Sequence, residues 1–252
     1  MAKKYLIANW KMSPSSLSKA KDLFSFFRKK LKNKKSLEIV FAPPFVYLSD
    51  LLKLNSAKNF IKYGAQDVFW EEEGSFTGEI SIKELKDLGV KYVIVGHSER
   101  RSLGETNSDV NKKIKVVLHN KIIPVVCIGE KERDGHGDYL AFVRKQISGA
   151  LEGVKLEDLK NIIFAYEPVW AIGKSDEESI KPHDLEQMII YIRKVLMEIY
   201  NDSSVMRAKI IYGGSVEKGN SRTLLEETSI NGFLIGHASL DKEEFFEIYK
   251  SF

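Results

Sequence analysis

The chain of 252 residues has a single cysteine and lacks any long apolar run. Cys127 cannot form an intrachain disulfide, and its apolar neighbours predict a small core residue. No apolar stretch approaches the roughly 20 residues that span a bilayer. The residues from Met1 to Tyr5 also lack the apolar core of a signal peptide. These absences argue against a membrane protein and lead us to expect a cytoplasmic location.

The chain also lacks an excess of one charge. Its 39 Lys and Arg residues and 35 Asp and Glu residues give a net charge of +4. The basic residues are spread along the chain and form no stripe with aromatic residues, which argues against nucleic-acid binding. No two His, Asp or Glu residues stand at ligand spacing on one predicted element. We therefore expect no metal site.

Strand-like and helix-like segments alternate along the whole chain. Short apolar, β-branched runs precede segments whose apolar residues recur at helical spacing. The predicted strands cover residues 5–9, 37–42, 61–65, 92–96, 122–128, 162–166, 209–212 and 232–235. Helices are expected at 17–31, 45–54, 81–88, 108–119, 139–151, after Pro182, near 219–225 and at 241–249, with 98–107 as a connecting loop.

Eight strand-helix units without a Pro/Ser-rich linker predict one α/β domain over residues 1–252, a barrel of eight parallel strands. The length alone would also fit two small domains. A doubly wound open sheet is the alternative architecture, but such sheets usually carry Gly-x-Gly-x-x-Gly after the first strand. This chain has Asn9 to Met12 at that position. In a barrel of this kind the chemistry lies at the carboxyl ends of the strands.

Several predicted strand ends carry side chains suited to proton transfer. Glu167 ends the sixth strand, and the following Pro168 cannot continue a sheet ladder. His97 follows the fourth strand and Lys11 the first. Around one cavity, these groups can supply a base, an electrophile and an anion anchor for moving a proton beside a carbonyl. Taken singly, they could instead be a solvated glutamate, a core histidine and a surface lysine.

Two further features stand at strand ends. The turns at 213–215 and 236–239 follow the last two strands, and their backbone N–H groups can bind a phosphate dianion or simply form tight turns. The loop after Glu167 carries Trp170 and Ile172, with Gly173 as a pivot. We expect this loop to cover the carboxylate and exclude water, although an ordinary strand-to-loop boundary is the alternative.

Taken together, these motifs resemble the triosephosphate isomerase family. The similar segments occur in order at 9–12, 64–67, 76–81, 96–101, 127–130, 165–173, 212–215 and 232–236. The resemblance implies a single (β/α)8 TIM barrel without a cofactor that interconverts dihydroxyacetone phosphate and D-glyceraldehyde 3-phosphate in glycolysis and gluconeogenesis. It also implies a homodimer in which the loop containing Thr77 inserts into the neighbouring subunit.

The resemblance further implies roles for individual residues. Glu167 would be the base and His97 a neutral electrophile, with Asn9 beside it and Lys11 as the fixed positive charge. Glu99 would tether Lys11 or its neighbours. The remaining supporting and phosphate-binding residues implied are Ser98, Ile172, Gly173, Ser215, Leu234, Gly236 and His237.

The chain departs from the family pattern at two places. Lys174 to Ile180 replaces the usual small latch of the covering loop, and Gly236-His237 stands where the family commonly has Gly-Gly. These changes leave a related isomerase of a four-carbon ketose phosphate as the nearest alternative. A non-catalytic phosphate-binding barrel is the alternative from another class, although the intact Asn9, Lys11, His97 and Glu167 argue against it.

Overall fold

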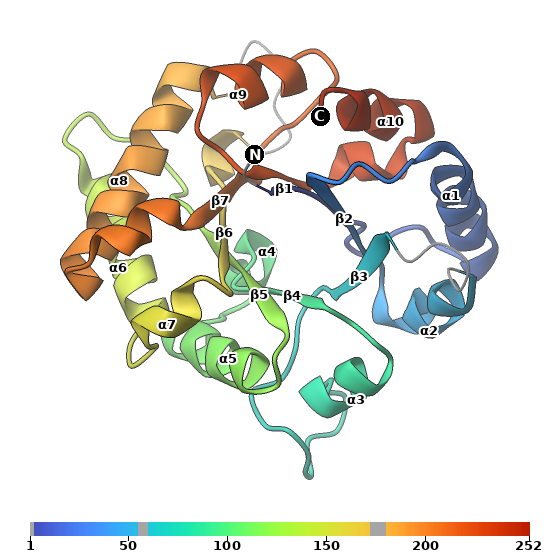
Figure 1. Cartoon of the computed structure of the whole chain (residues 1–252). Helices are drawn as coiled ribbons and strands as arrows, with labels where there is room; N and C mark the ends of the chain where they lie inside the picture. The colour runs from blue at the N-terminus through green and yellow to red at the C-terminus, as the bar shows by residue number, and fades with distance from the viewer. Residues whose placement is uncertain (1–2, 55–59, 172–179) are drawn as a thin grey trace.

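A computed structural model describes residues 3–54, 60–171 and 180–252 of the chain. Parallel strands pair in chain order and close into an eight-stranded barrel, with helices packed around the outside (Figure 1). The strands are β1 (Lys4–Asn9), β2 (Leu37–Ala42), β3 (Ile61–Ala65), β4 (Tyr92–Val95), β5 (Ile123–Ile128), β6 (Ile163–Tyr166), β7 (Lys209–Tyr212) and β8 (Gly232–Ile235). The predicted (β/α)8 barrel is confirmed.

Eight of the ten α-helices in the described residues follow the predicted segments to within a few residues. The ten are α1 (Leu17–Lys30), α2 (Phe45–Leu54), α3 (Ile82–Asp87), α4 (Ser98–Ser102), α5 (Asn107–His119), α6 (Asp138–Ala150), α7 (Leu156–Leu159), α8 (Pro182–Tyr200), α9 (Ser221–Glu227) and α10 (Lys242–Lys250). Capping boxes start α3 at Ser81 and α5 at Thr106, so local side-chain hydrogen bonds set where these helices begin.

The strands are buried on both faces. On β1, Ile7 points into the barrel, whereas Leu6 and Ala8 pack against the outer helices. Cys127 on β5 and Leu234 on β8 belong to the interior cluster, which confirms that the cysteine is a core residue. Alternating side chains with apolar contacts on both sides explain why these strands appear in the sequence as nearly continuous apolar runs.

The register of the last strands aligns the segments that follow them. Ile128 pairs with Tyr166 across β5 and β6, and Tyr166 pairs with Tyr212 across β6 and β7. The hydrogen bonds continue past the strands, because the Glu167 N–H donates to the Ile128 carbonyl at 2.8 Å and the Gly213 N–H donates to the Tyr166 carbonyl at 2.8 Å. Glu167 is therefore fixed between the turns that follow its two neighbouring strands.

The short helices α4 and α7 were not predicted. Residues 98–107, predicted to be a loop, contain the short helix α4 directly after β4. None of the residues of α4 is buried, so the segment has no apolar periodicity to reveal a helix. Within the described ranges, no helix combines the length and the apolar character needed to cross a membrane.

Candidate active site

A cavity of about 740 Å³ opens at the carboxyl ends of the strands. Side chains and turns that follow β1, β4, β6, β7 and β8 line it, which brings together segments far apart in the sequence. The predicted site residues among its lining are Asn9, Lys11, His97, Glu167, Ser215, Leu234, Gly236 and His237. The carboxylate, the imidazole and the ammonium therefore share one chamber.

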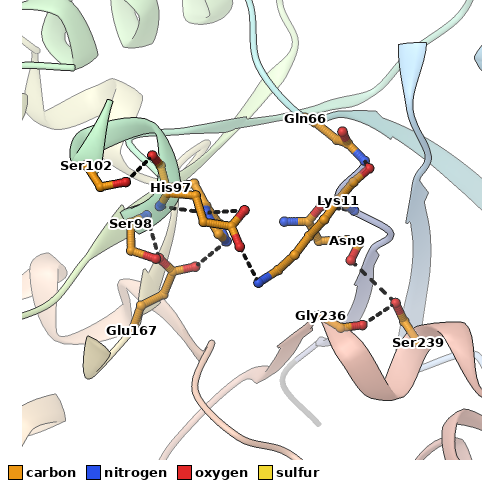
Figure 2. A network of polar contacts seen from close by, with 10 residues as sticks. Asn9, Lys11, Gln66, His97, Ser98, Ser102, Glu167, Gly236 and Ser239 are labelled. Carbon is orange, nitrogen blue, oxygen red and sulfur yellow. Dashed lines mark hydrogen bonds and ion pairs between the residues drawn. The ribbon is translucent and has the colours of Figure 1, made fainter. Parts of the chain in front are cut away.

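The carboxylate of Glu167 is buried and held in a defined orientation. The residue is only 2% exposed, its Oε2 accepts a hydrogen bond from the Ser98 N–H at 3.1 Å, and its Oε1 lies 3.3 Å from His97 Nε2 (Figure 2). A buried carboxylate with few hydrogen bonds is less solvated than one in water. Such a group is suited to accept a proton once a substrate replaces the remaining water.

The backbone of α4 defines the tautomer of His97. His97 is the N-cap residue of α4, and its Nδ1 accepts a hydrogen bond from the Glu99 N–H at 3.2 Å. A ring nitrogen that accepts a hydrogen bond carries no proton, so we assign the proton to Nε2 and the neutral form to the ring. The Nε2–H group is on the side of the ring that faces Glu167. The imidazole can therefore donate to a substrate oxygen.

The backbone of Lys11 adopts an unusual conformation that contacts on both sides stabilise. Its φ is +52°, in the left-handed region that residues other than glycine rarely occupy. The Lys11 N–H donates to Asn9 Oδ1 at 3.0 Å, and Gln66 Nε2 donates to the Lys11 carbonyl at 2.8 Å. The ammonium then reaches Glu99, with Nζ 2.7 Å from Oε1 (Figure 2). The positive charge is thus directed over the cavity.

Two glycines give Glu167 the space that it occupies. A Cβ atom on Gly129 would lie 1.9 Å from the backbone oxygen of Glu167, and one on Gly213 would lie 2.8 Å from its Cγ. Neither contact is sterically possible without movement of Glu167. The position of the carboxylate therefore depends on the absence of side chains at both neighbouring strand ends.

The first turn after β6 is fixed to the barrel. Trp170 lies in the short 3₁₀ helix η1 (Val169–Ala171) and packs against the core, and its Nε1 donates to Glu130 Oε1 at 2.8 Å. The Tyr166 hydroxyl donates to the same oxygen at 2.8 Å. Burial, followed by the nearby Glu130 carboxylate, raises the pKa of Tyr166 far above its usual value, so the phenol remains a donor.

Cys127 lies behind the carboxylate and is chemically passive. The side chain is fully buried. Burial, followed by the proximity of Glu167, raises the pKa of the thiol well above its ordinary value. A protonated, inaccessible thiol is neither a nucleophile nor a metal ligand. Among residues 3–54, 60–171 and 180–252, no cluster of three or more His, Cys, Asp or Glu side chains is arranged to hold a metal ion.

Some predicted site residues lie elsewhere or outside the described ranges. Ile172, Gly173 and residues 174–179 fall outside them. Thr77 is exposed on the loop after β3 and does not line the cavity. Ser215 does line it, and its Oγ donates to the Ala171 carbonyl at 2.9 Å.

The sequence motifs included Gln66, Gly129 and Gly213 but gave no sign of the contacts that they make. Each of these three residues stands at a predicted strand end, and this position was the indication in the sequence that it could belong to the site. The contacts of the two glycines with Glu167 follow from the register of β5, β6 and β7, and the Gln66 contact depends on the path of the chain after β1. The sequence of one segment alone predicts neither the glycine contacts nor the Gln66 contact.

Comparisons with known proteins agree with the geometry of the site. The sequence profile of the family described as triosephosphate isomerase matches residues 4–252. A triosephosphate isomerase of Alkaliphilus oremlandii is 42% identical over 251 residues, covering 98% of this chain and 99% of the relative. That of Dictyoglomus thermophilum is 41% identical over 255 residues and covers all of both chains. This chain therefore belongs to the triosephosphate isomerase family.

Proposed function

We infer that the protein interconverts dihydroxyacetone phosphate and D-glyceraldehyde 3-phosphate through an enediolate intermediate. The observation that carries this inference is the buried Glu167 carboxylate 3.3 Å from the His97 imidazole, in a cavity that also contains Lys11. A base and a hydrogen-bond donor at this separation can act on adjacent carbon and oxygen atoms of one small molecule. Because the substrates are charged phosphates, which cross lipid poorly, we propose that the reaction takes place in the cytoplasm.

We propose that Glu167 removes the proton from the carbon beside the substrate carbonyl and returns it to the neighbouring carbon. His97 donates its Nε2–H to the oxygen on which negative charge develops. Asn9 assists at the same end of the cavity, and its side-chain oxygen also orients the Lys11 backbone. A donor that is already oriented needs no reorganisation as the charge forms, and in comparable sites its removal costs roughly 3 to 4 kcal/mol.

We further propose that the phosphate binds at the far side of the cavity, beside Lys11. The turns after β7 and β8 contribute Ser215, Gly236 and His237 to the cavity wall. A Cβ atom on Gly236 would lie 3.0 Å from Lys11 Cε, so this turn passes directly beside the lysine side chain. Backbone N–H groups of such turns are suited to a dianion, and Lys11 adds a full positive charge.

We propose that water is excluded from one side by Leu234, which is 2% exposed and lines the cavity. Ile172 and Gly173, expected to complete the cover and to reach the phosphate, lie outside the described residues. Exclusion of water has a chemical purpose, because a free enediol phosphate can expel its phosphate before it is reprotonated.

The substrate assignment is tested by comparing kcat/KM for triose and four-carbon ketose phosphates. We expect the triose to be preferred. A preference of more than about tenfold for the longer sugar would assign the site to the related isomerase. A correctly folded protein without turnover in an assay coupled to a dehydrogenase would instead support the non-catalytic alternative.

Replacement of Gly129 by alanine is expected to lower kcat by roughly 100-fold, because the new Cβ must displace the backbone of Glu167. Steady-state kinetics measure the effect, and circular dichroism establishes that the barrel is intact. Gly135 to alanine is the matched control, since the structure shows nothing within 4 Å of a Cβ at that position. Full activity of a folded Gly129→Ala protein would mean that catalysis does not depend on this position of Glu167.

We propose that the protein is a homodimer assembled through the loop that contains Thr77. This loop extends beyond the ring of helices between β3 and α3 (Figure 1). It is closed at its base by a hydrogen bond from the Phe69 N–H to the Ile80 carbonyl at 2.9 Å. Phe69 also packs on Phe76 with ring centroids 4.7 Å apart, yet Phe76 remains 44% exposed. An ordered loop with an exposed aromatic ring is suited to insertion into a partner.

Substitution of Thr77 by arginine is expected to convert the dimer to monomers, because a long charged side chain would have to be buried in the interface. Sedimentation velocity measures the change in mass. Ser148→Arg, on the exposed side of α6, is the control that should leave the mass unchanged. A Thr77→Arg protein that remains dimeric at low micromolar concentration would exclude this loop from the interface.

A further inference from the structure

We propose that the side chain of His237 is a pH-dependent anchor for the phosphate group of the substrate. The inference rests on the proposed function, because it requires the phosphate to bind between the turns after β7 and β8. It adds a side-chain contact that the Gly236-His237 sequence of this chain can provide. It also predicts that phosphate affinity depends on pH in a way that Lys11 alone cannot produce.

The position of His237 is the first support. His237 is exposed and lines the cavity at the start of the 3₁₀ helix η3 (His237–Leu240), directly after β8. The preceding Gly236 lies against Lys11, with a virtual Cβ 3.5 Å from the Nζ atom. His237 and Lys11 therefore line the same cavity, and the residue before His237 lies against Lys11.

The pairing of the surrounding charges is the second support. Lys11 Nζ lies 2.7 Å from a Glu99 oxygen, and Lys218 Nζ lies 3.7 Å from a Glu244 oxygen. Each of these lysines thus forms an ion pair with a carboxylate. The side chain of His237, in contrast, has no hydrogen bond or ion pair with another residue in the described parts of the chain. Its ring nitrogens remain available to a ligand.

Other ionisable groups also line the cavity. They are Lys11, His97, Glu167, Glu217, Lys218, Asp241 and Glu244. His97 has its Nδ1 occupied as an acceptor, and Asp241 accepts the N–H groups of Glu243 and Glu244 at the start of α10. Among side-chain types, imidazole is the one whose charge ordinarily changes between about pH 5 and 8.

Protonation of His237 would strengthen the binding of a dianion by a charge-assisted hydrogen bond. Because the side chain is exposed, water and salt weaken the interaction, and we expect a change of about two- to fivefold in the dissociation constant. The effect concerns a part of the substrate that does not react. It should therefore change KM and inhibition constants more than kcat.

Inorganic sulfate is the appropriate probe, because it remains a dianion throughout this pH range, whereas the phosphate of the substrate itself titrates. We would measure the inhibition constant of sulfate against D-glyceraldehyde 3-phosphate at intervals from about pH 8 to about pH 5.5. In the unmodified protein the constant should fall about two- to fivefold over this range. In the His237→Gln protein it should stay constant, because glutamine keeps a polar side chain without a titratable group.

His119→Gln is the matched control. This histidine has a side chain that is 80% exposed and ends α5, which leads back to the opposite rim of the barrel. Its replacement should preserve the pH response of sulfate inhibition. The same pH response in the His237→Gln protein would overturn the proposal while leaving the phosphate site in place. Sulfate that fails to compete at any pH would overturn the phosphate site, and the role of His237 with it.

Discussion

Replacement of Glu167 by glutamine is expected to lower kcat by at least about two orders of magnitude while changing KM only modestly. The amide has nearly the same shape as the carboxylate but cannot accept the proton from carbon. The contacts of the Glu167 side chain with the Ser98 N–H and with His97 position it before the reaction begins. The substrate should therefore still bind to the glutamine variant. The loss of activity should therefore appear in the proton-transfer step. Steady-state kinetics in both reaction directions measure it.

The control for this prediction is the same substitution at Glu132. That glutamate is exposed on the loop after β5, so its conversion to glutamine removes a charge near the rim without altering the cavity lining. It should leave kcat within a factor of about two. An unchanged kcat in the Glu167→Gln protein would remove Glu167 from the role of base, whatever its position in the structure.

The strands were the most predictable part of the fold. The bounds of β2, β3, β7 and β8 agree with those expected from the sequence. Each is a short run of apolar residues packed on both faces and bounded by polar or turn residues, so burial alone identifies it. Closure into a barrel followed from the count of eight units and the absence of linkers.

The helix α4 could not be predicted, because its stability does not come from an apolar face. Its sequence, Ser-Glu-Arg-Arg-Ser, contains no apolar residue. The helix is held instead by His97 at its start and by Arg101, whose Nε donates to the Gly96 carbonyl at 2.7 Å. Burial lowers the pKa of Arg101 from its ordinary value, which shows how deeply this cation is packed. Such contacts depend on the surrounding strands and leave no periodic signal.

The site was predictable as a set of strand ends but not in its internal contacts. Parallel strands in a barrel bring Lys11, His97 and Glu167 to one rim wherever they stand in the sequence. Their orientations depend on side chains from other segments, such as Gln66 on the Lys11 carbonyl. The hydrogen bond from Trp170 to Glu130 is a further example, because the sequence of the turn gives no sign of it.

Replacement of Lys11 by methionine is expected to abolish most of both binding and turnover. The ammonium lies beside the turn at Gly236 and beside the carboxylate of Glu99. Its removal leaves a dianionic substrate without a cation and leaves Glu99 as an uncompensated negative charge near the cavity. Both changes oppose anion binding, and the cost of losing one oriented charge in a comparable site is roughly 3 to 4 kcal/mol. We therefore expect kcat/KM to fall by about 150- to 900-fold.

The matched control is Lys121→Met. Lys121 also has a left-handed backbone, with φ +61°, but it is exposed in the turn before β5, at the opposite rim of the barrel. Methionine at both positions meets the same conformational penalty, so only the loss of the cation differs between the two proteins. If inorganic phosphate inhibits the Lys11→Met protein almost normally, Lys11 does not provide the charge that binds the substrate. Near-absence of inhibition there, with normal kinetics in the control, would assign both binding and turnover to the Lys11 ammonium.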